Sequence, residues 1–81
     1  MVGFFRVMYM YFRRIGDMRI DSDKTQKEVA AYLHMDAGVY RRYEKGEREI
    51  PVWAVIQLAE LYQTSTDYLL GRTDNPSMPR M

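Results

Sequence analysis

The chain has 81 residues, a net charge of +1 at pH 7, no cysteine and a single histidine, His34. This length suits one domain, and the lack of thiols excludes disulfides, a cysteine nucleophile and a thiolate metal site and fits a reducing cytoplasm. Without a glycine-rich phosphate loop or a carboxylate pair in a plausible pocket we expect no enzyme, cofactor or metal, and a nearly neutral chain must bind any polyanion through a local surface.

Residues 1–8 begin the chain with an apolar and aromatic segment, "MVGFFRVM". Arg6 interrupts the apolar run and no small-residue cleavage site follows, which argues against a secretory signal. The segment is also too short to cross a membrane. Two interpretations stay open. The segment is an N-terminal extension, either packed on the domain or lying before a truer start at Met8 or Met10, or it is an arm for dimerisation.

Helical spacing recurs through residues 9–71, whereas strand alternation is weak throughout. This pattern predicts an all-α domain, followed over residues 72–81 by a polar tail that we expect to be mobile. We expect the first helix over residues 9–20 and the second from Thr25 to about Leu33. At residues 25–28, "TQKE" is a capping box, in which the Thr25 hydroxyl accepts from the Glu28 N–H.

The third helix is expected over residues 37–45, with Asp36 as its N-cap and Gly46 as its stop. At 100° per residue, Val39, Tyr40 and Tyr43 face inward. The opposite face carries small and basic residues, namely Ala37, Gly38, Arg41, Arg42 and Lys45. Such arginines form either an ordinary solvated surface or forked donors for guanine and phosphate, and the angles alone leave both interpretations open.

The fourth helix is expected over residues 51–63, and a short fifth helix over 66–70 with Ser65 as its cap. We expect the core face of the fourth helix to consist of Val52, Val55, Ile56, Ala59 and Tyr62. A second apolar stripe then lies on the far side, made of Ala54, Leu58 and Leu61. This stripe suits either a homodimer interface or packing under the N-terminal segment.

Two helices separated by about three residues indicate a helix-turn-helix. The stretches "TQKEVAAYL" (25–33), "VYRRYEKGER" (39–48), "VIQLAELY" (55–62) and "STDYLLGRTDNP" (65–76) resemble the phage-repressor-like helix-turn-helix family, also called Xre or Cro/repressor-type regulators. The resemblance covers residues 13–75. It implies a compact five-helix domain of the lambda-repressor type, with the helix-turn-helix at about 25–45.

The resemblance also implies where DNA would bind, with the third helix in the major groove. The expected contacts lie at the start of the second helix, along the outer face of the third and in the loop after it: Thr25, Gln26, Ala37, Gly38, Arg41, Arg42, Lys45 and Arg48. Gln26 either contacts a phosphate or only fills the capping box. Because Ala37 and Gly38 are poor readers of bases, specificity would depend on Arg41 and Arg42, helped by DNA shape.

Other positions match structural residues of the family. Arg19 and Glu44 match an arginine and a glutamate that often pair across the domain. His34 stands where the turn usually has glycine, at a position that tends to need positive φ, and histidine is one of the types tolerated there. A pH switch or a ligand role is the alternative for His34. Gly46 ends the third helix.

Tyr40 and Tyr43 stand where the family usually has aliphatic residues. We expect their rings to be buried and their hydroxyls to lie near the rim, where a phosphate contact is an option.

These features predict a sequence-specific double-stranded DNA-binding protein of the cytoplasm. It would be a homodimeric transcriptional regulator of a pseudo-palindromic operator, with repression favoured over activation and no membrane partner. The alternative is a protein-interaction module, such as an antitoxin or anti-repressor component, for which the apolar N-terminus and the second stripe of the fourth helix argue.

Overall fold

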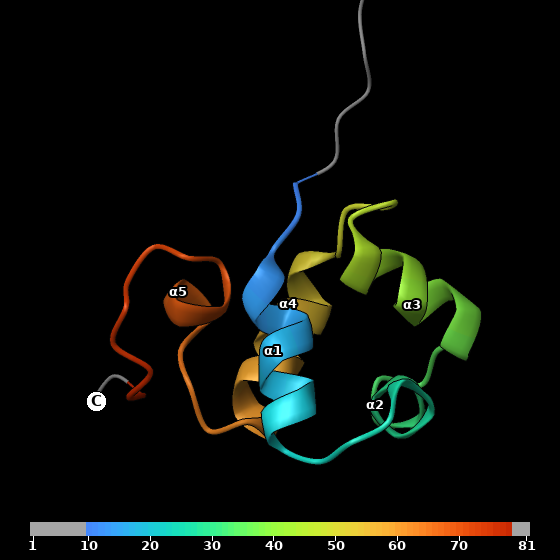
Figure 1. Ribbon diagram of the computed structural model, residues 1–81, viewed down its shortest axis with the longest axis horizontal. Helices are drawn as coiled ribbons and strands as arrows, with labels where there is room; N and C mark the ends of the chain where they lie inside the picture. The colour runs from blue at the N-terminus through green and yellow to red at the C-terminus, as the bar shows by residue number, and fades with distance from the viewer. Residues whose placement is uncertain (1–9, 79–81) are drawn as a thin grey trace, which may run out of the picture.

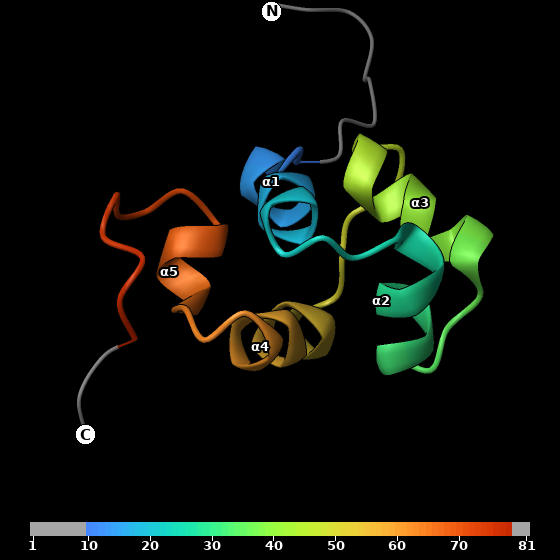
Figure 2. The same cartoon turned by 60° about the horizontal axis from the view of Figure 1, so that its bottom comes forward.

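The computed structural model describes residues 10–78, and the predictions for residues 1–8 lie outside that range. It contains five helices: α1 (Arg13–Asp21), α2 (Gln26–Tyr32), α3 (Ala37–Lys45), α4 (Val52–Leu61) and α5 (Thr66–Leu69). α1 and α4 occupy the middle, α5 lies at one end and α2 with α3 at the other (Figures 1 and 2). The predicted all-α, five-helix architecture is confirmed. Across residues 10–78, no helix combines the length and apolarity that a membrane span requires.

The predicted helix ends are largely confirmed, because local chemistry sets them. The Thr25 hydroxyl accepts from the Glu28 N–H at 3.0 Å, and the Glu28 carboxylate accepts from the Thr25 N–H at 2.8 Å. Asp36 Oδ2 accepts from Gly38 N at 2.9 Å and from Val39 N at 3.2 Å. The first helix is shorter than predicted, starting at Arg13, since Phe12 before it is extended and offers no capping side chain.

Left-handed residues end several of the helices. Gly46 has a φ of 76° after α3, and His34 has a φ of 56° after α2, as its place in the turn suggested. Asp23 and Gln63 have φ values of 56° and 54° in the turns after α1 and α4. The sequence did not single out these last two positions, because neither residue type marks a left-handed turn as glycine does.

The core runs through the middle of the domain and draws on every helix. Its largest fully buried apolar side chains are Ile15, Val29, Leu33, Tyr40, Leu58 and Leu69. Burying side chains of this size stabilises a domain by roughly 1.5–3 kcal/mol each before the entropy of ordering is subtracted. This core fixes α2 and α3 on the rest of the domain.

The predicted core face of α4 is right for Val55 and Ala59, which are buried, and wrong for Val52 and Ile56. Leu58 and Ala54 are fully buried, whereas Val52 is 75% exposed and Ile56 is 46% exposed. Nearly every position of α4 is apolar, so periodicity alone could not choose between the two stripes. The stripe that packs inward contains Ala54 and Ala59, whose small side chains let neighbouring helices approach closely. The proposed partner surface on Ala54 and Leu58 is therefore core.

Residues 72–76 are less free than a mobile polar tail would be. The Arg14 guanidinium donates to the carbonyl oxygen of Tyr68 at 3.0 Å and to that of Thr73, and it pairs with Asp74 Oδ1 at 2.6 Å. The Thr64 hydroxyl donates to the Pro76 carbonyl oxygen. These contacts hold the segment beside α5, as Figure 1 shows.

Candidate nucleic-acid interface

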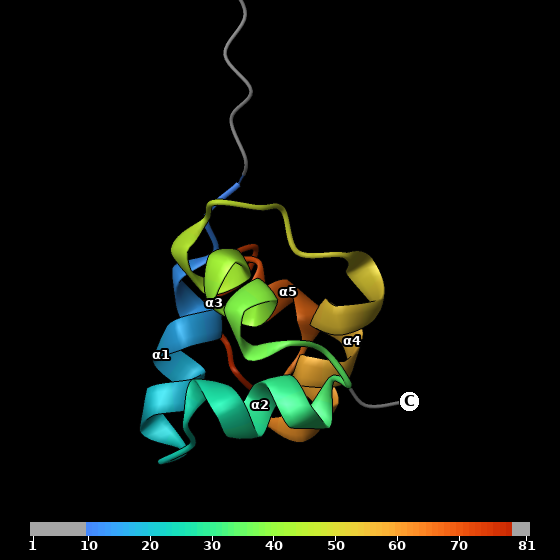
Figure 3. The same cartoon turned by 90° about the vertical axis from the view of Figure 1, so that its right-hand side faces the viewer.

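α2 and α3 form a helix-turn-helix at one end of the molecule. α2 ends at Tyr32 and α3 begins at Ala37, so the turn consists of residues 33–36. Within it, the His34 N–H donates to Ala31 O at 3.1 Å and the Met35 N–H donates to Ala30 O at 2.9 Å. Leu33 is buried and anchors the turn in the core. In Figure 3, α2 runs across the view while α3 points toward the reader, so the two helices turn sharply.

The outer face of α3 presents its basic side chains to solvent. Arg41, Arg42 and Lys45 are exposed, whereas Tyr40 is fully buried and Tyr43 is half-buried against the core. The predicted division of this helix into a basic outer face and a tyrosine inner face is therefore confirmed. Among residues 10–78, the guanidinium groups of Arg41 and Arg42 have no ion-pair partner. Both are available for an outside anion or base.

The N-terminus of α3 carries two small residues, and the structure gives a local reason for one of them that the sequence did not reveal. Ala37 and Gly38 are half-buried, and Ala37 packs against the core, so it does not lie wholly on the outer face as expected. A Cβ placed on Gly38 would lie 2.9 Å from Asp36 Oδ2, the oxygen that caps the helix. A side chain at this position would disturb the cap, so Gly38 has a structural role besides any close approach to DNA.

The loop after α3 and the start of α2 contribute further polar groups. Arg48 is exposed, and Lys45 Nζ lies 3.5 Å from Glu47 Oε2 in a pair that is itself exposed. Such exposed pairs contribute little and are easily exchanged. Thr25 is exposed, and its hydroxyl accepts the cap hydrogen bond while keeping its own proton for an outside acceptor.

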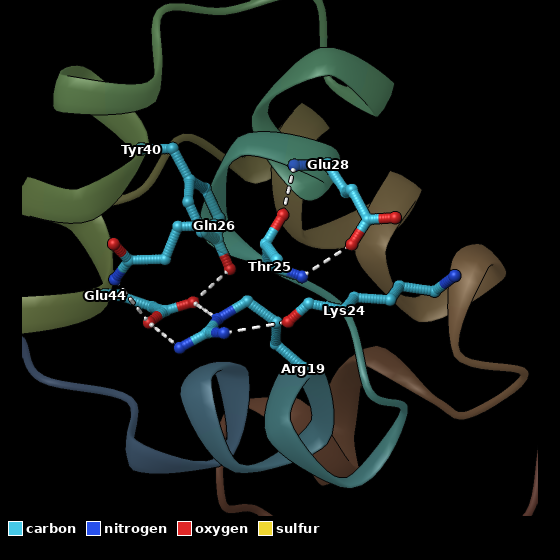
Figure 4. A network of polar contacts seen from close by, with 7 residues as sticks. All are labelled: Arg19, Lys24, Thr25, Gln26, Glu28, Tyr40 and Glu44. Carbon is cyan, nitrogen blue, oxygen red and sulfur yellow. Dashed lines mark hydrogen bonds and ion pairs between the residues drawn. The ribbon is translucent and has the colours of Figure 1, made fainter.

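A buried polar network ties α3 to α1 and to the chain before α2 (Figure 4). Arg19 Nε lies 2.6 Å from Glu44 Oε2 and Arg19 Nη2 lies 3.2 Å from Oε1, a two-pronged pair. Arg19 Nη1 also donates to the Lys24 carbonyl oxygen at 2.8 Å. The side chains are 15% and 8% exposed. The expected Arg19–Glu44 pair is thus present and holds the recognition helix on the domain.

Two more groups donate to the Glu44 carboxylate. The Tyr40 hydroxyl donates to Oε2, and Gln26 Nε2 donates to Oε1 at 3.1 Å. Burial would raise the pKa of Glu44, but hydrogen bonds from Arg19, Tyr40 and Gln26 outweigh it and hold that pKa below its usual value. Burial, and then the hydrogen bond to Glu44, raise the pKa of Tyr40.

This network corrects the expectation for Tyr40. Its hydroxyl lies inside the domain on Glu44 and not at the rim, so it is not placed to contact a phosphate. The physical reason is that a carboxylate buried beside it needs the donor. For Tyr43, which is half-buried, the phosphate contact stays a prediction.

The network also brings together residues that the sequence placed separately. The Gln26–Glu44 hydrogen bond sets the start of α2 beside the second half of α3. Residues 10–78 contain no group of three or more His, Cys, Asp or Glu side chains arranged to hold a metal ion. What this end of the molecule offers is a set of cations and amide or hydroxyl donors, which is the chemistry of anion and base-edge recognition.

The fold and this surface define a helix-turn-helix domain. A family model described as "Helix-turn-helix" matches residues 15–69, and the chain therefore belongs to that family, as the resemblance to Xre-type regulators suggested.

Two relatives come from Bacillus subtilis (strain 168). The chain is 33% identical over 67 residues to an uncharacterized HTH-type transcriptional regulator, YobD, covering 83% of this chain and 60% of that protein. It is 34% identical over 62 residues to the HTH-type transcriptional regulator ImmR, covering 76% of this chain and 49% of ImmR. The chain thus spans about half to three fifths of the length of these relatives. Both are named as transcriptional regulators, which is a non-enzymatic kind of protein.

A solved structure shares the fold. The crystal structure of a transcriptional regulator from Listeria innocua superposes with a TM-score of 0.72 at 17% sequence identity, covering 85% of this chain and 64% of that one. At this identity the likeness establishes the arrangement of helices.

Proposed function

We propose that this protein binds double-stranded DNA sequence-specifically in the cytoplasm as a homodimeric transcriptional regulator, with α3 in the major groove. The observation that carries the proposal is the outer face of α3, where the exposed Arg41 and Arg42 have no ion-pair partner among residues 10–78. A guanidinium group can fork onto O6 and N7 of guanine or onto a phosphate. Within this proposal repression is favoured over activation, in line with the resemblance to phage-repressor-like regulators.

The remaining contacts would position the domain on the DNA backbone. Lys45 and Arg48 supply exposed cations at the end of α3 and in the following loop, and Thr25 and Gln26 supply neutral donors at the start of α2. Contacts of this kind fix register without reading sequence. Sequence reading would then depend on Arg41 and Arg42 and on the shape of the DNA.

Selecting bound duplexes from a random library tests this proposal most broadly. We expect enrichment of a two-fold symmetric site with half-sites about one helical turn, or roughly 34 Å, apart. No enrichment over the input library would contradict sequence-specific binding. An enriched single half-site would contradict the homodimer while leaving DNA recognition in place.

Self-association is supported by an exposed apolar face of α4, which replaces the stripe first expected there. Val52, Trp53 and Ile56 are exposed on this face. Beside it lies a hollow of about 400 Å³, lined by Phe12 and Leu70 among others. Apolar surface of this kind often marks a protein interface.

The oligomeric state can be measured by sedimentation with a matched pair of variants. Ile56→Asp places a charge on the exposed α4 face, whereas Ile20→Asp places one on an apolar position of α1 that is more exposed still. We expect the unchanged chain and Ile20→Asp to form dimers and Ile56→Asp to be monomeric. Monomers for all three at DNA-binding concentrations would contradict this interface.

The same face also supports a second candidate function, a protein-interaction module such as an antitoxin or anti-repressor component. Co-purification with an unrelated protein, lost in Ile56→Asp, together with no affinity for DNA, would favour that function over the first.

A further inference from the structure

The side-chain amide of Gln26 has a fixed orientation in this protein. Its Nε2 donates to Glu44 Oε1 at 3.1 Å. An ionised carboxylate accepts hydrogen bonds and cannot donate them, so the nitrogen and not the oxygen of the amide must face Glu44. Figure 4 shows the amide oxygen of Gln26 turned away from the carboxylate.

This orientation leaves one donor free. A primary amide nitrogen carries two hydrogens, and only one of them is used on Glu44. Gln26 is half-buried at the first position of α2. The second N–H has no hydrogen-bond partner among residues 10–78, and part of the side chain is open to solvent. We propose that Glu44 is a positioning residue for DNA binding, which fixes the amide of Gln26 so that this second N–H is presented to a DNA phosphate. The inference rests on the proposed function.

A free carboxylate beside a phosphate would be repulsive, and the network removes that difficulty. Arg19 forks onto both oxygens of Glu44, at 2.6 and 3.2 Å, and matches its charge. Glu44 can thus hold Gln26 without adding net negative charge to the surface. The carboxylate stays ionised over the neutral range, since hydrogen bonds keep its pKa low despite burial.

Tyr40 completes the arrangement on the opposite oxygen. Its hydroxyl donates to Oε2, while Gln26 donates to Oε1. Both oxygens of Glu44 therefore carry two hydrogen bonds, and the carboxylate has no remaining freedom to turn. Tyr40→Phe removes one donor while keeping the buried ring and the charge pair, so it is a mild probe of the same positioning.

The last side-chain torsion of glutamine has two broad orientations of similar energy, related by exchange of the amide oxygen and nitrogen. Without Glu44, the oxygen of Gln26 would therefore face outward about as often as the nitrogen. An outward amide oxygen repels a phosphate. Gln26 would also regain rotamer freedom that DNA binding must then remove. We therefore expect Glu44→Gln to weaken binding to a selected duplex by about 3- to 10-fold.

The test is a double-mutant cycle on DNA affinity, with melting curves to confirm that each variant is folded. Gln26→Ala should weaken binding by about 5- to 10-fold. Introducing Glu44→Gln into the unchanged chain should weaken DNA binding by about 3- to 10-fold. Introducing it into the Gln26→Ala chain should weaken DNA binding by less than about 2-fold. Lys45→Ala is the matched control, because Lys45 is an exposed neighbour of Glu44 with no bond to Gln26, and its loss should be the same in both backgrounds.

Where Glu44→Gln lowers the melting temperature below that of the assay, Tyr40→Phe takes its place, with an expected loss of about 2- to 3-fold that also vanishes in the Gln26→Ala background. The side-chain amide signals of Gln26 in NMR spectra give a direct readout. One of the two protons should be shifted in the free protein and move toward the free-amide position in the Glu44→Gln chain. The other should shift when DNA is added.

Equal losses in both backgrounds, or Gln26 amide signals unaffected by Glu44→Gln, would overturn the inference. If Gln26→Ala leaves affinity unchanged while Arg41→Ala weakens it, the inference fails and the proposed function stands. If the unchanged chain binds no duplex, both fail.

Discussion

Replacing Arg41 or Arg42 by alanine should weaken DNA binding without weakening the fold. Both side chains are exposed, and among residues 10–78 neither forms an ion pair that the substitution would break. Alanine is also a good helix former. The free energy of unfolding should therefore change by no more than about 0.5 kcal/mol. DNA binding should lose about 1–3 kcal/mol per arginine, which is about 5- to 150-fold in Kd.

The assay is a set of duplexes that differ from the selected site by one base pair at a time, titrated with each variant at fixed salt. If an arginine reads a base, its removal should relax specificity at one position. If it contacts a phosphate, binding should weaken equally on all duplexes and the salt slope should fall by about 1.

Arg72→Ala is the matched control, because Arg72 is an exposed arginine in the segment after α5, at the far end from α3 (Figure 1). It should change Kd by less than about 2-fold, in line with a charge far from the bound surface. Unchanged binding by both Arg41→Ala and Arg42→Ala would refute the assignment of this face to DNA. Loss of binding accompanied by unfolding would refute the claim that these two side chains do not stabilise the fold.

Three further predictions concern the fold and the polar network. Leu58→Ala should lower the free energy of unfolding in urea by about 2–5 kcal/mol, because Leu58 is buried. Val52→Ala should lower it by less than about 0.5 kcal/mol, because Val52 is exposed. A larger effect for Val52→Ala than for Leu58→Ala would show that Val52 belongs to the core, as first expected from the sequence. Since the folded pKa of Glu44 lies below its unfolded value of about 4.3, its contribution is complete above that pH and is lost as pH falls through the folded pKa. The free energy of unfolding should thus decline below about pH 4, and the decline should be smaller in Glu44→Gln. The same decline in both proteins would contradict this prediction. The Tyr62 hydroxyl is buried with no partner among residues 10–78, and burial followed by the charge of Glu44 raises its pKa to about 12. Tyr62→Phe should leave the free energy of unfolding unchanged or raise it by up to about 1 kcal/mol. A clear loss would reveal a partner for that hydroxyl.

Much of the fold could be predicted from the sequence because short-range chemistry determines it. The capping box at Thr25, the cap at Asp36 and the stop at Gly46 each depend on residues within a few positions of one another. His34 was assigned to the turn through the resemblance, at a position that usually has glycine, and histidine is among the types enriched at positive φ. Helical geometry likewise separated the basic and the tyrosine faces of α3.

The errors arose where distant parts of the chain decide the outcome. α4 is apolar almost all round, so its buried face depends on which neighbours pack against it. The hydroxyl of Tyr40 donates to Glu44 one turn along the same helix, but Glu44 is held in that buried place by Arg19 and Gln26, which come from other segments. The pair of Arg19 and Glu44 was expected only through resemblance, and the hydrogen bond from Gln26 to Glu44 was not expected at all, since nothing local in the sequence indicates it.

The salt dependence of binding tests the central claim most directly. Each protomer offers four exposed cations on the proposed surface, namely Arg41, Arg42, Lys45 and Arg48. If Lys45 and Arg48 of both protomers contact phosphates while Arg41 and Arg42 read bases, log K against log salt should have a slope of about −3.6, and if both arginines also contact phosphates, a slope of about −7. The measurement uses the unchanged chain on its selected duplex over a range of salt concentrations. A slope within that range is the result we predict, and a slope near zero would contradict the proposal that this surface binds DNA.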